Sequence, residues 1–217
     1  MTDRNIIKIT EEFVKNRLLG EGTGHDWWHT VRVSGMAKRI QKIEGGNKVI
    51  IDLACLLHDV GDRKVIDKDN DDYVITENFL KQHKVPDDSI TKVMFIIKNM
   101  SFSKHLKNKI VDAPIEFQIV QDADRLDAIG AVGIARMFTY GGSKKRPIFD
   151  PDLPARNIKT TDQYKQPNAS SFHHFEEKLL HVKGLLNTGT AMSIADGRDK
   201  YMRLFIDQFL DEWNGKK

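Results

Sequence analysis

The segment from Val49 to Leu57 constrains the fold most, because it is apolar on nearly every side when it is drawn as a helix. Such a segment is stable only when other helices surround it, so it predicts a central buried helix. Elsewhere the apolar residues recur at spacings of three and four, which is typical of amphipathic helices packed around a core. The sequence shows no convincing strand pattern. It therefore predicts an all-α fold, a multi-helix bundle.

The predicted organisation is one domain over residues 1–217 with three parts. A core that carries the chemistry covers about 24–138, and the C-terminal helices lie within about 171–213. Between these parts, residues 140–170 hold four of the six prolines of the chain. A stretch of this length without a periodic pattern in a compact domain is usually a functional loop, a lid or a disordered segment.

Local patterns set three further expectations. Residues 101–108 are polar, and we expect them to be irregular. After Pro114 we expect one helix that continues through Ala135 along a stripe of small residues. The apolar spacing from Phe172 to Leu186 predicts a single helix in that segment.

Composition argues against several classes of protein. Lys and Arg number 34 and Asp and Glu number 31, and this net charge of +3 gives no support for a nucleic-acid or membrane partner. The single cysteine, Cys55, cannot form an internal disulfide, so we expect a reducing compartment and a cytoplasmic location. Residues 1–5 are polar, unlike a signal peptide. No segment reaches the roughly 18 uninterrupted apolar residues that a membrane span needs.

Four polar residues lie where the predicted helices should be apolar, namely His29, His58, Asp59 and Asp124. Burying an ionised carboxylate is very costly unless it is paired or bound to a metal ion. Two imidazoles and two carboxylates suit Mn²⁺, Fe²⁺, Zn²⁺ or Ni²⁺ better than Ca²⁺. Each residue alone also fits a structural role, as a hydrogen-bonded core histidine, a charged helix end or a capping carboxylate. Their order along the chain favours the metal site.

Three motifs resemble those of a known family. They are His29-Thr30-Val31-Arg32-Val33, Leu57-His58-Asp59-Val60-Gly61 and Ala123-Asp124-Arg125-Leu126-Asp127. In this order and at these spacings they resemble the HD-domain superfamily of metal-dependent phosphohydrolases. The strings Gln121–Ala131, Gly24–His29 and Tyr140–Gly142 are similar to one bacterial subgroup of small, stand-alone HD hydrolases.

The resemblance implies a single divalent metal ion, with Mn²⁺ as the first choice and Mg²⁺, Fe²⁺, Ni²⁺ and Zn²⁺ as alternatives. The implied ligands are His29, His58, Asp59 and Asp124. Asp124 is preferred because the family's last motif has an apolar residue two positions after its Asp, and Asp122 and Asp127 are the register alternatives. Asp127 shares the helix face of Asp124, so we expect it to orient a ligand or hold a metal-bound water.

Further residues are candidates for the reaction itself. Asp62 follows Asp59 by three positions, where many HD enzymes carry an acidic residue, and we predict a general acid or base there; an ordinary loop carboxylate is the alternative. The basic residues expected to hold phosphate oxygens are Arg63, Lys64, Lys144, Lys145 and Arg146. For the last three the hypothesis is a lid that closes over a polyphosphate, and the alternative is a solvated surface patch, which such a run more often forms. His25, four residues before His29, is expected to contact the substrate or a ligand side chain, with a plain surface role as the alternative.

The expected activity is hydrolysis of a nucleoside triphosphate with release of pyrophosphate, and this expectation rests on the resemblance alone. The second hypothesis is a nucleoside monophosphate phosphatase or a phosphodiesterase. A two-metal site is disfavoured, because only His83 and His105 lie between the His-Asp pair and Asp124. The third hypothesis is a ligand-binding helical protein with a structural metal. The expected partner is a phosphorylated small molecule, a nucleotide in particular, and a homodimer is a candidate assembly.

Overall fold

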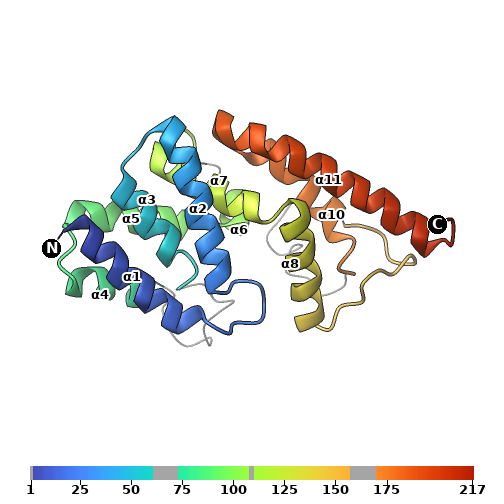
Figure 1. Cartoon of the computed structure of the whole chain (residues 1–217), viewed down its shortest axis with the longest axis horizontal. Coiled ribbons are helices and arrows are strands. Elements are labelled where there is room, and N and C mark those ends of the chain that lie inside the picture. The colour runs from blue at the N-terminus through green and yellow to red at the C-terminus, as the bar shows by residue number, and fades with distance from the viewer. Residues whose placement is uncertain (1, 61–72, 108–109, 157–169) are drawn as a thin grey trace. The chain divides into compact units, whose positions relative to one another are not determined.

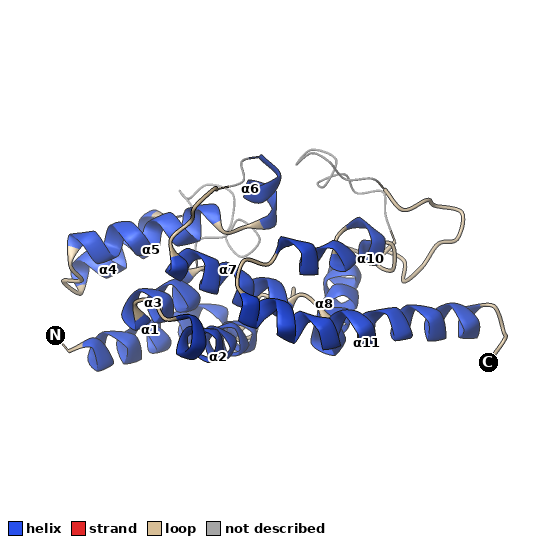
Figure 2. Cartoon of the chain, turned by 90° about the horizontal axis from the view of Figure 1, so that it is seen from above, coloured by secondary structure: helices blue, strands red, loops and turns tan. Residues whose placement is uncertain are grey.

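The computed structural model describes residues 2–60, 73–107, 110–156 and 170–217. Every regular element in these ranges is a helix, and no strand occurs among them (Figure 2). The predicted all-α fold is therefore confirmed. The chain divides into two compact units, residues 1–123 and residues 124–217. Whether they behave as one domain, as the sequence predicts, stays a prediction.

The N-terminal unit is built around one helix that its neighbours enclose (Figure 1). Its helices are α1 (Asp3–Leu18), α2 (Trp27–Glu44), α3 (Lys48–Leu57), α4 (Val74–Gln82), α5 (Asp87–Asn99), α6 (Phe102–Lys107) and α7 (Ile115–Asp127), the last of which crosses into the next unit. Helix α3 packs against α1, α2 and α5. All of its residues from Ile50 to Leu57 are buried, as the apolar segment predicted.

Side-chain caps fix where the two central helices begin. The Asp26 carboxylate accepts a hydrogen bond of 2.8 Å from the backbone N–H of His29 at the start of α2. The Asn47 side chain accepts from the N–H groups of Val49 and Ile50 at the start of α3. Such caps satisfy amides that have no partner within the helix. They therefore set the register in which α2 and α3 present their side chains to each other.

The C-terminal unit contains α8 (Gly130–Ser143), α10 (His174–Glu177), the 3₁₀ helix η1 (Leu179–Leu185) and α11 (Gly189–Trp213). Helix α11 packs against α8 and η1. Seven aromatic side chains interlock in this unit: Phe138, Phe149, Phe172, Phe175, Phe205, Phe209 and Trp213. Phe172 and Phe175 are buried within this cluster, so the cluster contributes to the core of the unit, whereas Trp213 is 49% exposed.

Two of the expected helices differ from the structure. The helix predicted to run through Ala135 is interrupted, because α7 ends at Asp127 and Gly130 has a left-handed φ of +77°. The single helix predicted from Phe172 to Leu186 is also wrong, since a four-residue α10 gives way to the 3₁₀ helix η1. The buried residues Leu179 and Val182 are three positions apart, which suits the three residues per turn of a 3₁₀ helix.

Two segments expected to be irregular are partly helical. Residues 101–108 include α6, so that expectation is wrong. Within the Pro-rich segment 140–170, helix α8 continues to Ser143, and residues 144–156 contain turns but neither helix nor strand. Residues 157–169 lie outside the described residues, so the loop predicted there stays a prediction. Among the helices of the described residues, none combines the length and the apolar character that a membrane span needs.

Candidate metal centre

Three donor atoms converge where α2 meets the end of α3. The Nε2 atoms of His29 and His58 are 3.2 Å apart. They lie 3.4 Å and 3.3 Å from the same oxygen, Oδ2 of Asp59. All three residues are buried, and the most exposed of them, His58, retains 8% of its surface. The packing of α2 on α3 thus brings together three of the side chains that the sequence singled out.

The ring of His58 is oriented by the backbone of its own helix. Its Nδ1 lies 2.8 Å from the carbonyl oxygen of Cys55. A carbonyl can only accept, so Nδ1 donates this hydrogen bond, and whenever the ring is neutral its lone pair is on Nε2. Metal-binding histidines are typically oriented in this way through the other ring nitrogen.

The close approach of the two Nε2 atoms fits a bound cation. Two nitrogen lone pairs facing each other at 3.2 Å repel unless a proton or a cation lies between them. The nearby carboxylate of Asp59 adds the negative charge that a divalent ion favours. Two imidazole nitrogens and one carboxylate oxygen are a donor set common to Mn²⁺, Fe²⁺, Ni²⁺ and Zn²⁺ sites. The residues present therefore fit a divalent metal.

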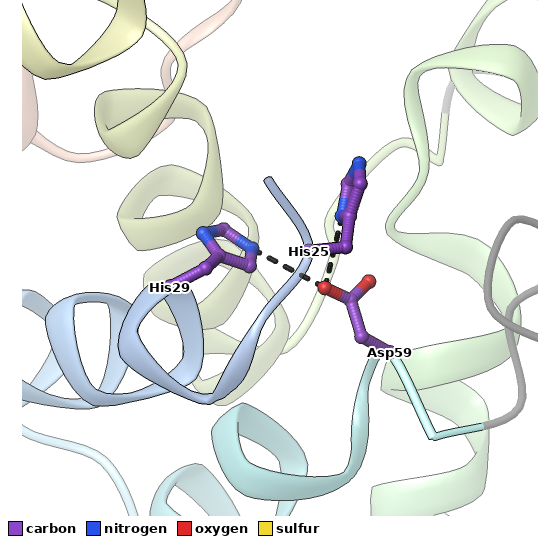
Figure 3. A group of neighbouring side chains, drawn as sticks. All are labelled: His25, His29 and Asp59. Atoms are coloured by element: carbon purple, nitrogen blue, oxygen red, sulfur yellow. Dashed lines mark hydrogen bonds and ion pairs between the residues drawn. The ribbon is translucent and has the colours of Figure 1, made fainter. Parts of the chain in front are cut away.

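His25 joins the cluster from the loop before α2 (Figure 3). Its Nδ1 lies 3.0 Å from Oδ2 of Asp59, and its side chain is 17% exposed. The donor atoms of His25, His29 and Asp59 all lie within 4.8 Å of one another. His25 thus contacts Asp59, one of the predicted ligands, and its expected role at the site stays a prediction.

The surroundings of Asp59 keep its carboxyl group ionised. Burial by itself raises the pKa of Asp59, but His58 and His25 outweigh it by charge and hydrogen bonding and hold the pKa well below its ordinary value. A buried carboxylate in this position carries its negative charge at neutral pH. It is therefore ready to act as an anionic donor to a cation.

Glu21 orders the loop that carries His25. The sequence patterns considered above did not identify Glu21 as a functional residue. Its carboxylate accepts hydrogen bonds from the backbone N–H of Thr23 at 3.0 Å and 2.8 Å, from the Thr23 hydroxyl at 2.8 Å and from the N–H of His25 at 3.2 Å. The available signal was an acidic residue within a glycine-rich turn, two positions before a threonine. Such residues often bond to backbone groups a few positions further on.

The other predicted acidic ligands lie on α7. Asp124 is the first residue of the C-terminal unit, and its assignment as a metal ligand stays a prediction. Oδ2 of Asp127 lies 3.1 Å from Nη1 of Arg136, so this side chain forms an ion pair within the C-terminal unit. Its expected role in orienting a ligand or a water also stays a prediction. The register alternative Asp122 is fully buried.

The predicted phosphate-binding residues fall into two groups. Lys144 and Arg146 follow the end of α8, and their charged groups each lie 5.7 Å from the centre of the Tyr140 ring, while Lys145 is exposed. Asp62, Arg63 and Lys64 lie outside the described residues. Their roles in catalysis and phosphate binding therefore stay predictions.

Comparison with known proteins decides the family. The family model of the HD domain matches residues 27–129, a range that includes His29, His58, Asp59 and Asp124. The protein YpgQ of Bacillus subtilis is 35% identical over 196 residues, which is 90% of this chain and 88% of YpgQ. The chain belongs to the HD-domain superfamily. The predicted assignment to this superfamily of metal-dependent phosphohydrolases is confirmed.

Solved structures agree with this assignment over almost the whole chain. A protein from Lactobacillus plantarum superposes with a TM-score of 0.88 at 36% identity, covering 99% of this chain and 100% of that one. An HD-superfamily hydrolase from Bacillus thuringiensis gives 0.74 at 40% identity, covering 98% and 99%. YpgQ in complex with ADP gives 0.74 at 33% identity, covering 95% and 96%.

Proposed function

We propose that this HD-superfamily hydrolase cleaves a phosphoanhydride bond of a nucleotide and holds one divalent metal ion, Mn²⁺ in first place. The ligands are His29, His58, Asp59 and Asp124. The observation that carries the proposal is the convergence of two Nε2 atoms and Oδ2 of Asp59 within 3.4 Å of one another in a buried position. These three donors leave further coordination positions for other ligands, as catalytic rather than structural sites do.

When bound, a divalent ion supplies polarisation of a phosphoryl oxygen and a water of lowered pKa. The residues of the protein orient the donor atoms and keep them in the state that binds such an ion. The Cys55 carbonyl holds the His58 ring in one orientation, and Asp59 keeps its negative charge through His58 and His25. Asp62 is proposed to move the proton between the attacking water and the leaving group.

A nucleotide is the proposed substrate because the similar protein YpgQ has a solved structure in complex with ADP. A nucleoside triphosphate cleaved to a monophosphate and pyrophosphate is the reaction that the family resemblance favours. The leaving pyrophosphate carries several negative charges, which call for positive groups beyond the metal. Lys144, Lys145 and Arg146, together with Arg63 and Lys64, are the proposed groups.

Product analysis tests the proposal. The chelator-treated protein is reloaded with Mn²⁺, incubated with a panel of nucleoside mono-, di- and triphosphates, and its products are separated by ion-exchange chromatography. Monophosphate with pyrophosphate supports the proposal, and orthophosphate from a monophosphate supports the phosphatase alternative. No hydrolysis of any nucleotide by the loaded protein would contradict both. A His58→Ala variant prepared in parallel reports contaminating activity.

A further inference from the structure

We propose that Glu21 is a positioning residue of the metal centre. Its carboxylate holds the loop between α1 and α2 in the conformation in which the His25 ring contacts the Asp59 carboxylate. The inference rests on the proposed metal-binding function, and it assigns a role to a residue that is not itself a ligand. The chain of contacts runs from Glu21 to the backbone of His25, and from the His25 ring to the Asp59 carboxylate.

The loop between α1 and α2 is rich in glycine, and part of it has open space around it. Three glycines alternate with other residues at positions 20, 22 and 24, and a Cβ added at Gly20 or at Gly22 would meet nothing within 4 Å. Gly20 and Gly24 both have a φ of +89°, a backbone region open chiefly to glycine. A segment of this composition loses much conformational entropy when it is ordered, so its conformation depends on specific hydrogen bonds.

Glu21 supplies those hydrogen bonds. Both of its oxygens accept from the backbone N–H of Thr23, and Oε2 also accepts from the Thr23 hydroxyl and from the backbone N–H of His25. Hydrogen bonds to an ionised acceptor are stronger than those between neutral groups. One side chain thus fixes the backbone on both sides of Gly24. The direction in which the His25 side chain leaves the loop is fixed with it.

The His25 ring in turn restrains the orientation of the proposed ligand Asp59. With its backbone held, the ring Nδ1 lies 3.0 Å from Oδ2 of Asp59, and the ring packs edge-on against His29 at a centroid distance of 5.4 Å. The contact restrains rotation of the Asp59 carboxylate about its last bond. Losing an outer partner of a metal-binding side chain typically weakens metal binding 10–100-fold. Glu21 therefore acts on metal affinity through His25.

A merely structural role for Glu21 makes a different prediction. A residue that only stabilises the loop would lower the unfolding temperature of the metal-free protein. Its loss would then add to the loss caused by removing His25, because the two effects would be independent. A positioning role predicts the opposite pattern, in which removal of His25 makes Glu21 irrelevant to metal binding.

A double-mutant cycle separates these roles. Mn²⁺ binding to the full-length, chelator-treated protein is measured by isothermal titration calorimetry for wild type, Glu21→Gln, His25→Ala and the double variant. Thermal unfolding of each metal-free protein is followed by circular dichroism. Glu12→Gln, on the exposed face of α1, is the matched control for loss of one negative charge.

We expect Glu21→Gln to weaken Mn²⁺ binding about tenfold, the lower end of the range for such partners. We expect His25→Ala to weaken it at least as much, the double variant to match His25→Ala, and Glu12→Gln to match wild type. Wild-type affinity in Glu21→Gln, or an additive loss in the double variant, would overturn the positioning role while leaving the proposed function intact. Failure of the wild-type protein to bind Mn²⁺ would overturn the metal-binding proposal itself, and this inference with it.

Discussion

Replacing Glu177 by Gln tests how strongly the buried ion pair of the C-terminal unit contributes to stability. Arg156 holds the Glu177 carboxylate with two side-chain hydrogen bonds, of 2.6 Å from Nε and 2.9 Å from Nη2. Burial by itself raises the pKa of Glu177, but the hydrogen bonds from Arg156 and the nearby His174 outweigh this effect and lower the pKa from 4.5 to about 2. The Glu177 side chain is only 1% exposed, so solvent screens the pair little.

The size of the effect follows from this pKa difference. A fall from 4.5 to about 2 corresponds to about 3 kcal/mol at about 1.4 kcal/mol per unit. The folded-state pKa is the lower one, so this stabilisation is fully present above the unfolded-state pKa of 4.5. It is lost as the pH falls towards the folded-state value. We therefore expect Glu177→Gln to lower the free energy of unfolding by about 3 kcal/mol at pH 7, close to the cost of breaking a buried pair.

The test is urea unfolding of the wild type and of Glu177→Gln at a series of pH values, from 7 down to the lowest pH at which the native state persists. It measures the difference in the free energy of unfolding between the two proteins. The difference should shrink steadily as the pH falls below the unfolded-state pKa. Glu176→Gln, at the exposed neighbouring position, is the control and should leave stability nearly unchanged at every pH. A difference for Glu177→Gln that stays constant with pH would refute the assignment of the stability to the ionised carboxylate.

Three further outcomes are expected. His58→Ala should lose stoichiometric metal in elemental analysis, because it removes a ligand nitrogen, and full retention would contradict the site. Asp62→Asn should retain its metal but lose at least about 100-fold in kcat, and a wild-type rate would remove its role as acid or base. Gly141→Ala should be destabilised by about 1–3 kcal/mol in thermal unfolding, because its Cβ would lie 1.9 Å from Oγ of Ser171. Gly142→Ala, with open space around its Cβ, should be as stable as wild type or more so, and equal effects at the two glycines would contradict the packing argument.

Part of the centre could be predicted from the sequence because burial leaves a periodic signature. His29 interrupts an apolar helical stripe, and His58 and Asp59 end the most apolar segment, so spacing marks all three as polar residues at buried positions. The order of the motifs and the family resemblance, rather than spacing, assigned them to one site. Glu21 gave no periodic signal, because its partners are two backbone amides and the Thr23 hydroxyl. An acidic residue in a glycine-rich turn indicates bonds of this kind, and the loop conformation shows which groups it holds.

The errors in the fold have a similar cause. Apolar residues spaced by three and four continue across Gly130, yet the backbone turns there into a conformation that glycine adopts readily. A spacing of three between Leu179 and Val182 fits both an α-helix and a 3₁₀ helix, so periodicity does not distinguish them. Local backbone geometry decides both cases, and a pattern of side-chain hydrophobicity does not encode it.

The hydrogen bond between His58 and Cys55 couples two properties that are usually separate. The Cys55 carbonyl lies in the last turn of α3. Because it accepts from Nδ1 of His58, one hydrogen bond ties the orientation of the ring to the end of the helix. A substitution that moved the end of α3 would move this oxygen and turn the imidazole away from Asp59. The position at which this helix ends and the capacity to hold an ion are therefore coupled through one backbone group.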